Sequence, residues 1–469
     1  MSRSAAPAVT GRPVVCIQGL GFVGAAMAVA VASARDEHGR PRFSVVGIDL
    51  PAPLGQERIG RINRGEFPFR TSDPALVEAT AAAHTAGNLS ASSDTAPFAT
   101  ADVIVVDIHL DVDTSGDRSA VDFTSFRAAV RTVGARMKPG ALLIVETTVP
   151  PGTCERVVAP ELAAAMRSRG VREDAFLLAH SYERVMPGED YLASITNFWR
   201  VYAGHTAEAA DACERFLSQV INVKDYPLTR LASTTASETA KVLENSYRAT
   251  NIAFIEEWGR FAEAVGINLF EVLTAIRVRP THNNIRQPGF GVGGYCLTKD
   301  PLFPGIATRD LFNRPDLGFP FSEMAVRVNA RMPLVSVDRL QSLLGGDVKG
   351  KRVLLMGVAY RQEVADTRYS PSQTFVEEMR RRGAVVLVHD PLVTDWPELA
   401  LTVSSDLPPA GSVDAVVFAV PHRAYRELDL AAWLEGGRPL VLDANAVLTS
   451  RQRQALKDAG CPLHAIGEG

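Results

Sequence analysis

The sequence has few cysteines, no strong excess of charge and no long hydrophobic run. Its 469 residues include five cysteines, and their wide spacing suggests neither a disulfide framework nor a zinc site. A formal net charge of −4 gives no reason to expect a nucleic acid or an anionic membrane as a partner. No apolar run reaches the roughly 18 residues of a membrane-spanning helix. We therefore expect a cytoplasmic protein without disulfides, metal or membrane contact.

The bulk composition is that of an ordinary globular protein. Hydrophobic residues make up 46% of the chain and charged residues 22%, and the length of 469 residues suggests two or three domains. Residues 1–12 are rich in Ser, Ala and Pro and lack the apolar core and cleavage site of a signal peptide. We expect them to form a flexible leader.

A glycine-rich turn follows the first apolar segment. Residues 14–18 are typical of a buried parallel strand and residues 25–34 of a helix, and Gly19-Leu20-Gly21-Phe22-Val23-Gly24 lies between them. In this G-x-G-x-x-G pattern Gly19 permits the tight turn, Gly21 lets a pyrophosphate approach, and Gly24 lets helix and strand pack closely. The helix N-terminus attracts the phosphates. The pattern predicts a dinucleotide site.

The next predicted strand, residues 43–48, ends at Asp49. An acidic residue at this position accepts hydrogen bonds from the adenosine ribose and repels a 2′-phosphate, which favours NAD over NADP. Its spacing from Gly19 is longer than usual, and the polar run at residues 35–40 is the apparent insertion. Further buried strands are predicted at residues 103–108 and 142–146.

Residues 287–301 combine flexible backbone with a reactive side chain. Four glycines lie between residues 289 and 294, where the backbone can bend sharply and approach a ligand closely. Cys296, Lys299 and Asp300 follow at once. Because the thiolate is the nucleophilic form of cysteine, a neighbouring lysine favours catalysis by Cys296. The alternative interpretation is a surface turn with a buried cysteine.

Residues 235–257 show helical periodicity without proline or glycine, and Lys241 and Asn245 share one face of the predicted helix because they are four positions apart.

After a linker turn around residues 345–351, apolar runs at 353–360, 385–388, 415–420 and 440–442 alternate with helical segments. This alternation predicts a second doubly wound α/β domain.

Five separated segments together resemble one enzyme family. Residues 288–300 are similar to P-G-x-G-x-G-G-x-C-x-x-K-D, the nucleophile loop of the UDP-glucose/GDP-mannose dehydrogenases. Residues 147–153 resemble that family's S-T-V-P-P-G-T loop, and residues 181–188 its S-P-E-R-V-x-P-G loop. Residues 237–245 contain its K-x-x-x-N helix, and residues 357–371 resemble G-x-A-[FY]-K-x-x-x-x-D-x-R-x-S-P.

The resemblance implies an α/β fold with two Rossmann-like doubly wound domains joined by a central all-helical dimerisation domain. We place the NAD-binding domain at residues 13–228, the central domain with the nucleophile loop at 229–335, and the UDP-sugar-binding domain at 336–469. The implied partners are a nucleotide sugar, NAD and a second copy of the chain. Three departures stand out: His109-Leu110-Asp111 replaces Thr-Pro, Tyr182 replaces proline, and Arg361 replaces lysine.

The resemblance also assigns roles to single residues. The implied catalytic residues are Cys296, Lys241, Asn245, Asp300, Glu183 and Thr148. The implied cofactor-binding residues are Gly19, Gly21, Phe22, Val23, Gly24, Asp49, Arg58, Lys299 and Arg368. The implied substrate-binding residues are Arg279 (reaching the partner subunit's site), Phe290, Gly293 and Arg361, the last acting with backbone amides on the diphosphate. No residue is assigned to a metal.

The implied reaction is a four-electron oxidation of a sugar C6 alcohol to the uronic acid, through a thiohemiacetal and a thioester on Cys296. Lys241, Asp300 and Glu183 remain alternatives for the general base. Three alternative functions remain: a single-oxidation dehydrogenase of the hydroxyacid or 6-phosphogluconate type, a family member with an altered substrate, and an inactive nucleotide-binding protein. The run at residues 183–188 favours a UDP-N-acetylhexosamine and the run at 293–300 favours UDP-glucose, so the sugar stays open.

Overall fold

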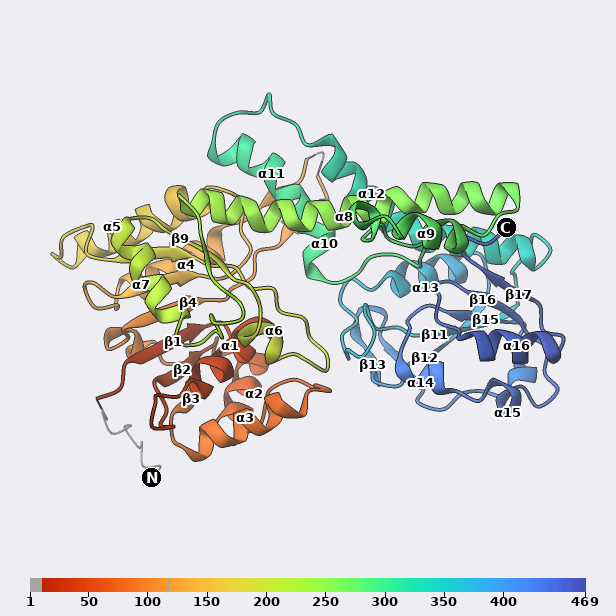
Figure 1. Cartoon of the computed structure of the whole chain (residues 1–469), viewed down its shortest axis with the longest axis horizontal. Coiled ribbons are helices and arrows are strands. Elements are labelled where there is room, and N and C mark those ends of the chain that lie inside the picture. The colour runs from red at the N-terminus through yellow and green to blue at the C-terminus, as the bar shows by residue number, and fades with distance from the viewer. Residues whose placement is uncertain (1–10, 117) are drawn as a thin grey trace. The chain divides into compact units, whose positions relative to one another are not determined.

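A computed structural model describes residues 11–116 and 118–469 (Figure 1). The chain forms two compact units, each described here by itself. The first comprises the chain up to Val242 together with Phe303–Leu317, and the second comprises Leu243–Leu302 and Gly318–Gly469. The leader predicted at residues 1–12 lies almost entirely outside the described residues.

The first unit contains an eight-stranded sheet of order β10-β9-β8-β7-β4-β1-β2-β3. Its strands pair in parallel except that β9 runs antiparallel to β8. The strands are β1 (Val14–Gln18), β2 (Ser44–Ile48), β3 (Leu89–Ser92), β4 (Val103–Val106), β7 (Leu142–Val145), β8 (Leu177–His180), β9 (Val201–Gly204) and β10 (Thr229–Arg230). A separate two-stranded ribbon pairs β5 (Val112–Asp113) with β6 (Ala120–Val121).

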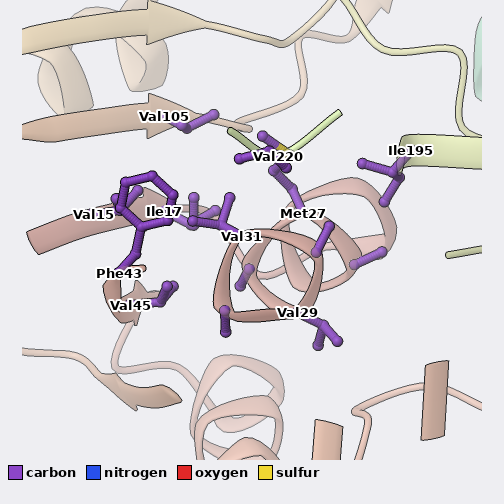
Figure 2. Close-up of a cluster of buried hydrophobic side chains, with 14 of the residues drawn as sticks. Val15, Ile17, Met27, Val29, Val31, Phe43, Val45, Val105, Ile195 and Val220 are labelled. Atoms are coloured by element: carbon purple, nitrogen blue, oxygen red, sulfur yellow. The ribbon is translucent and has the colours of Figure 1, made fainter. Parts of the chain in front are cut away.

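Helix α1 (Phe22–Ser33) is apolar on every side, and every residue from Gly24 to Ala32 is buried. Such a helix must be covered all round, and Figure 2 shows Met27, Val29 and Val31 among side chains from β1, β2 and β4. The other helices of this unit are α2 (Pro53–Ile62), α3 (Pro74–Thr85), α4 (Thr124–Gly134), α5 (Ala159–Ser168), α6 (Ala193–Thr196), α7 (Ala207–Leu217) and α11 (Phe303–Ile306).

The second unit contains a five-stranded parallel sheet of order β12-β11-β15-β16-β17. Its strands are β11 (Arg352–Met356), β12 (Val385–His389), β15 (Ala415–Phe418), β16 (Leu440–Asp443) and β17 (Leu463–Ala465), and β13 (Asp395–Trp396) pairs separately with β14 (Leu401–Thr402). The helices are α9 (Leu269–Arg277), α10 (Tyr295–Lys299), α12 (Pro320–Leu343), α13 (Pro371–Arg381), α14 (Arg423–Glu427), α15 (Leu430–Leu434) and α16 (Ser450–Asp458).

The longest helix, α8 (Thr234–Val265), contains the boundary between the two units. The predicted α/β fold class is confirmed, and each strand predicted from an apolar run is present. The helix expected over residues 235–257 continues to Val265 because residues 258–265 contain a single glycine and no proline. The domain boundaries stay a prediction, and the one at residue 335 falls inside α12.

Helix α12 continues through Pro333, although proline lacks a backbone N–H and clashes with the preceding turn. Pro333 is buried, and its ring contributes to the packing around Gly291. Among the described helices, none is long and apolar enough to cross a membrane.

Phe375 tests the core of the second unit, because its ring is fully buried between α13 and the sheet. Replacing Phe375 with alanine leaves a cavity, and we expect the free energy of unfolding to fall by about 3–5 kcal/mol in urea denaturation. Val385→Ala, at an exposed position of β12, is the control and should change it by about 0.5 kcal/mol or less. Equal losses in the two variants would contradict this account of the core.

Candidate active site

The glycine turn between β1 and α1 has the form of a phosphate-binding loop. Gly19 has a φ of +97°, and a side chain there would meet the Asp107 carbonyl oxygen at 2.6 Å. A Cβ on Gly24 would lie 1.9 Å from the Gly19 carbonyl oxygen, so only glycine lets the helix pack so closely. A Cβ on Gly21 would meet no atom within 4 Å. The turn is therefore tight where the chain packs on itself and open where α1 begins.

The other predicted cofactor residues of the first unit lie beside this turn. Phe22 and Val23 are the first residues of α1, and the Phe22 ring stacks on Phe69 at 4.1 Å. Asp49 follows β2, and its Oδ2 lies 3.3 Å from a guanidinium nitrogen of Arg58 on α2. The structure thus pairs Asp49 with Arg58, a contact that the sequence did not predict. This pairing holds the carboxylate at the end of β2.

Lys241 and Glu183 form the polar centre of the first unit. The Lys241 ammonium donates a 2.7 Å hydrogen bond to the Glu183 carbonyl oxygen and lies 3.5 Å from Oε1 of the same residue. Both residues are buried, so each charge needs the other as a partner. Tyr182, the residue in place of proline, lies beneath them with its ring centroid 5.4 Å from the ammonium. A cation over an aromatic face is attracted to it.

Two buried residues at the start of α8 support this centre. Glu238 accepts hydrogen bonds from the backbone N–H groups of Gly152 (2.6 Å) and Cys154 (2.7 Å) and so fixes the loop after β7. Burial raises the pKa of Glu238 to about 7, although those two N–H groups act against the rise. His180 contacts the Ser237 hydroxyl at 2.8 Å. Burial, assisted by the charge of Lys241, lowers the pKa of His180 to about 3, so this ring is neutral.

The predicted water-holding residue Thr148 lies in the loop that Glu238 fixes. It is half-buried, two residues before Pro150 and three after the end of β7. The neighbouring Thr147 donates from its hydroxyl to the Val106 carbonyl oxygen at 3.2 Å. The backbone around Thr148 is therefore anchored from both sides.

Sequence reasoning missed a set of charged residues at the carboxyl edge of the first sheet. Asp107 follows β4 and Glu146 follows β7, and Glu146 forms a buried ion pair with Arg200. Burial, and then the charge of Glu183, raises the pKa of Asp107 well above its ordinary value, while Arg200 opposes the rise. The usable signal was an acidic residue directly after an apolar strand.

The second unit brings together Asn245, Asp300 and Lys299. The Asn245 amide donates a 2.8 Å hydrogen bond to Oδ2 of the fully buried Asp300, and Lys299 lies 3.1 Å from the other carboxylate oxygen. Cys296 lies in the same short helix α10 as Lys299 and is exposed. Gly294, with a φ of +78°, precedes this helix. The buried acid is thus held by one amide and one cation.

Cys296 differs from the other four cysteines. Cys16, Cys154, Cys213 and Cys461 are buried, and burial raises the pKa of each thiol. A raised pKa disfavours the thiolate, and buried cysteines are chemically inert. Among the described cysteines, Cys296 is therefore the one suited to nucleophilic chemistry.

We expected a ligand to approach the glycines before Cys296 closely. In the structure, atoms of the second unit itself fill the space beside Gly293 and Gly294. A Cβ on Gly293 would lie 2.6 Å from the Tyr369 carbonyl oxygen, and one on Gly294 would lie 2.7 Å from the Tyr360 ring. Phe290 is buried against Phe375 at 5.5 Å. Any ligand contact of Phe290 must therefore come from its backbone.

The three predicted arginines of the second unit have different surroundings. Arg368 makes a forked pair with Asp366 and lies over the Tyr295 ring at 4.7 Å, next to Cys296. Arg361 is exposed in the loop after β11, and Arg279 is exposed before a short helical turn. No cluster of side chains suited to a metal ion is found in the described part of the chain.

Comparison with known proteins decides the family. The chain matches the UDP-glucose/GDP-mannose dehydrogenase family over its NAD binding domain at residues 14–221, its central domain at 235–331 and its UDP binding domain at 354–450. The chain belongs to this family. The predicted family and enzyme class are confirmed: it is an NAD-dependent nucleotide-sugar dehydrogenase, with NAD as cofactor and a nucleotide sugar as small-molecule partner.

Three known proteins show how far the likeness extends. UDP-N-acetyl-D-mannosamine dehydrogenase of Pyrococcus horikoshii is 29% identical over 88% of this chain and 91% of its own length. The structure of NDP-N-acetyl-D-galactosaminuronic acid dehydrogenase from Methanosarcina mazei is 28% identical, with a TM-score of 0.78 over 97% of this chain and 95% of its own. A UDP-glucose dehydrogenase structure from Pyrobaculum islandicum is 25% identical, with a TM-score of 0.80 over 99% and 100%.

The first unit suits a dinucleotide. Its open Gly21 position begins α1 without a side-chain cap, so backbone N–H groups of the first turn are available for a pyrophosphate. The single-residue assignments remain proposals.

The raised pKa of Glu238 predicts a specific dependence of stability on pH. Between its unfolded value of 4.5 and about 7, the folded protein binds more protons at this group than the unfolded chain. The contribution of Glu238 to the free energy of unfolding therefore falls as pH rises through this window. Glu238→Gln cannot titrate, so the wild type should lose on the order of 2 kcal/mol relative to the variant between pH about 5 and about 8. Urea denaturation measures this, and a constant difference would contradict it.

Proposed function

We propose that the chain oxidises the C6 alcohol of a nucleotide-diphospho-sugar to the carboxylate in two successive oxidations, with Cys296 as the covalent nucleophile. The observation that carries the proposal is the exposed Cys296 in the same short helix as Lys299, next to the buried Asn245–Asp300 pair. A simple alcohol dehydrogenase needs no such thiol, whereas oxidation of an aldehyde to an acid through a thioester requires one.

NAD, when bound, accepts the hydride released in each oxidation. In the first step Lys241 stabilises the negative charge on the alcohol oxygen as its proton leaves, directly or through a water held by Asn245 and Asp300. Glu183 supports this role because it holds the ammonium in place. The product of this step is the aldehyde.

In the second step the Cys296 thiolate adds to the aldehyde carbon, forming a C–S bond and, after protonation of the oxygen, a thiohemiacetal. Loss of a hydride and a proton gives a thioester. Water then attacks the thioester carbon and the C–S bond breaks, which returns the thiol and releases the uronic acid. Asp300, Thr148 and Glu183 are the candidates for holding this water.

For the substrate we favour a uridine-diphosphate sugar. Several relatives are named UDP-N-acetyl-D-mannosamine dehydrogenase, including those of P. horikoshii and Methanocaldococcus jannaschii. The run that begins with Glu183-Arg184-Val185 also favours a UDP-N-acetylhexosamine, so UDP-N-acetyl-D-mannosamine is the first compound to test. UDP-glucose is the second, because of the likeness to the P. islandicum enzyme. The substrate diphosphate would contact Arg361 in the second unit.

We also propose that the active form is a homodimer assembled through α8. One side of this helix exposes a row of apolar side chains, interrupted by one turn after Tyr247 and formed by Leu243, Tyr247, Phe254, Trp258, Phe261 and Val265. The spacing of four, seven, four, three and four residues keeps the row on one face. Apolar patches of this kind mark interaction sites, and a second α8 is the self-complementary occupant.

The stoichiometry of turnover tests the covalent mechanism. With the true substrate, the wild type should form two NADH per nucleotide sugar consumed, and the product should be the uronic acid. Cys296→Ala should complete no oxidation to the acid, because no thioester can form, so its rate of acid formation should fall by at least about 10³-fold. Coupled absorbance and mass spectrometry measure both quantities.

Cys461→Ala is the matched control, because this cysteine is buried; it should keep the wild-type stoichiometry. One NADH per sugar in the wild type would favour a single-oxidation dehydrogenase. No NADH with any nucleotide sugar would favour a binding role.

The dimer is tested by placing a charge in the exposed row. Trp258→Glu should convert the dimer to a monomer, because it buries an unpaired carboxylate in the interface. Light scattering after gel filtration measures the mass. Val77→Glu, at an exposed position of α3, should leave the dimer intact. A wild-type monomer, or a dimer that survives Trp258→Glu, would contradict the proposal.

A further inference from the structure

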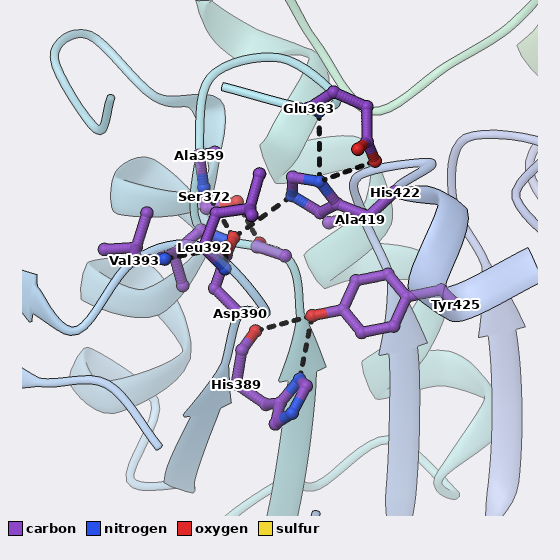
Figure 3. A network of polar contacts seen from close by, with 12 residues as sticks. Ala359, Glu363, Ser372, His389, Asp390, Leu392, Val393, Ala419, His422 and Tyr425 are labelled. Carbon is purple, nitrogen blue, oxygen red and sulfur yellow. Dashed lines mark hydrogen bonds and ion pairs between the residues drawn. The ribbon is translucent and has the colours of Figure 1, made fainter. Parts of the chain in front are cut away.

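A buried polar network lies at the carboxyl edge of the second unit's sheet. Strands β12, β11 and β15 are neighbours there, and Figure 3 shows the side chains that follow them, including Asp390 after β12 and His422 shortly after β15. Both side chains are completely buried. Most buried polar groups in proteins are hydrogen-bonded, and the hydrogen bonds of this network connect the turns that follow the three strands.

Asp390 organises the turns around it. Its Oδ2 accepts hydrogen bonds from the backbone N–H groups of Val358 (2.8 Å) and Ala359 (3.1 Å), which follow β11. Its Oδ1 accepts from Leu392 (2.9 Å) and Val393 (3.2 Å). Burial alone would raise the pKa of Asp390, but these bonds and His422 lower it below its usual value, so the carboxylate is charged.

This arrangement limits where a diphosphate can bind. The turn after the first strand of a Rossmann-like unit is where backbone N–H groups usually hold phosphates. Here the N–H groups of Val358 and Ala359 already donate to Asp390. We expected backbone amides to bind the diphosphate together with Arg361. The amides of Val358 and Ala359 cannot do so while they donate to Asp390, so the position of Arg361 becomes more important for binding the diphosphate.

His422 has a partner on each side of its ring. Nδ1 accepts a hydrogen bond from the backbone N–H of Glu363 at 3.1 Å and lies 3.6 Å from Oε1 of the same residue. Nε2 faces Oδ2 of Asp390 at 3.3 Å. The ring of Tyr425, with its centroid 5.6 Å away, packs edge-on against it. The His422 ring thus joins Asp390 to the backbone of Glu363.

Glu363 belongs to the loop that carries Arg361. A hydrogen bond from the Tyr360 N–H to the Asp366 carbonyl oxygen (2.9 Å) closes this loop at its base. Glu363 has a φ of +57°, a conformation that costs energy for a residue other than glycine. Besides His422, it is held by its own carboxylate, which accepts from the Arg423 N–H at 2.8 Å. These anchors fix the chain on both sides of Arg361.

We propose that His422 is a positioning residue for nucleotide-sugar binding. By accepting the Glu363 N–H while Asp390 orients its ring, His422 holds the loop of residues 360–366 in the conformation that presents Arg361 to the substrate. This inference rests on the proposed role of Arg361 in binding the diphosphate. Because the His422 side chain is completely buried, its loss should act on substrate binding through the loop and not on the chemical steps.

Two substitutions distinguish the roles of the two ring nitrogens of His422. In His422→Asn the side-chain oxygen can take the place of Nδ1 and accept the Glu363 N–H. In His422→Gln the longer side chain places its amide near Asp390 and leaves no acceptor at the Nδ1 position. Tyr425→Phe is the matched control, because it removes the hydrogen bonds to His389 in the same network but leaves Glu363 anchored.

Two measurements on the full-length chain test the inference. Hydrogen–deuterium exchange of residues 358–370 should be faster in His422→Gln and close to wild type in His422→Asn and Tyr425→Phe. The KM for the nucleotide sugar should rise about five- to tenfold in His422→Gln, the effect expected for one lost hydrogen bond. Its kcat should stay within about twofold of wild type.

An unchanged exchange rate in His422→Gln would overturn the inference. Equal increases in exchange rate in the His422→Asn and His422→Gln variants would also overturn it. Faster exchange with an unchanged KM would overturn the link between the loop and the substrate. Because exchange requires no turnover, it tests the anchoring by His422 even if the oxidation proposed above fails.

Discussion

A buried charged group needs a polar or oppositely charged partner. In this protein two side chains of helix α8 each take part in one such pair, and the two pairs lie at the centres of the two candidate clusters. Lys241 and Asn245 lie four positions apart on α8, and both are buried. In the first unit the Lys241 ammonium is held by the backbone and carboxylate of Glu183. In the second unit Asn245 holds the fully buried Asp300. Removing Glu183 or Asn245 would take one partner away from a buried charged group, which is costly in a protein interior.

The glycine-rich segments serve two different physical purposes. At the turn before α1, Gly24 allows close packing of the chain on itself, while Gly21 stays open to a ligand. At the segment before Cys296, Gly293 and Gly294 allow close packing against Tyr369 and Tyr360. The second segment therefore helps to fix the position of helix α10, which contains Cys296. The same residue type has both uses, because the absence of a Cβ admits whichever atom is nearest.

Much of the fold followed from local patterns. The apolar runs at β1, β4, β7 and β15 are short and almost unbroken, which is typical of strands buried on both faces. The strand-glycine-helix order around Gly19 and the Lys241–Asn245 spacing are equally local signals. The pairing of Arg200 with Glu146, and the link between Asp390 and His422, could not be found in this way. Their members lie beyond the ends of different strands, and the order of the strands in the sheet brings them together.

The sequence by itself determined the fold class, because strand and helix periodicity are properties of a few consecutive residues. The resemblance of five short motifs to a known family supplied the family, the cofactor and the candidate residues. Tertiary structure alone decided which candidates are buried and what holds them. It placed the Phe290 side chain in a core, bound the amides after β11 to Asp390, and left Cys296 exposed while burying the other four cysteines. Burial and partner choice depend on segments far apart in the chain, so no local pattern encodes them.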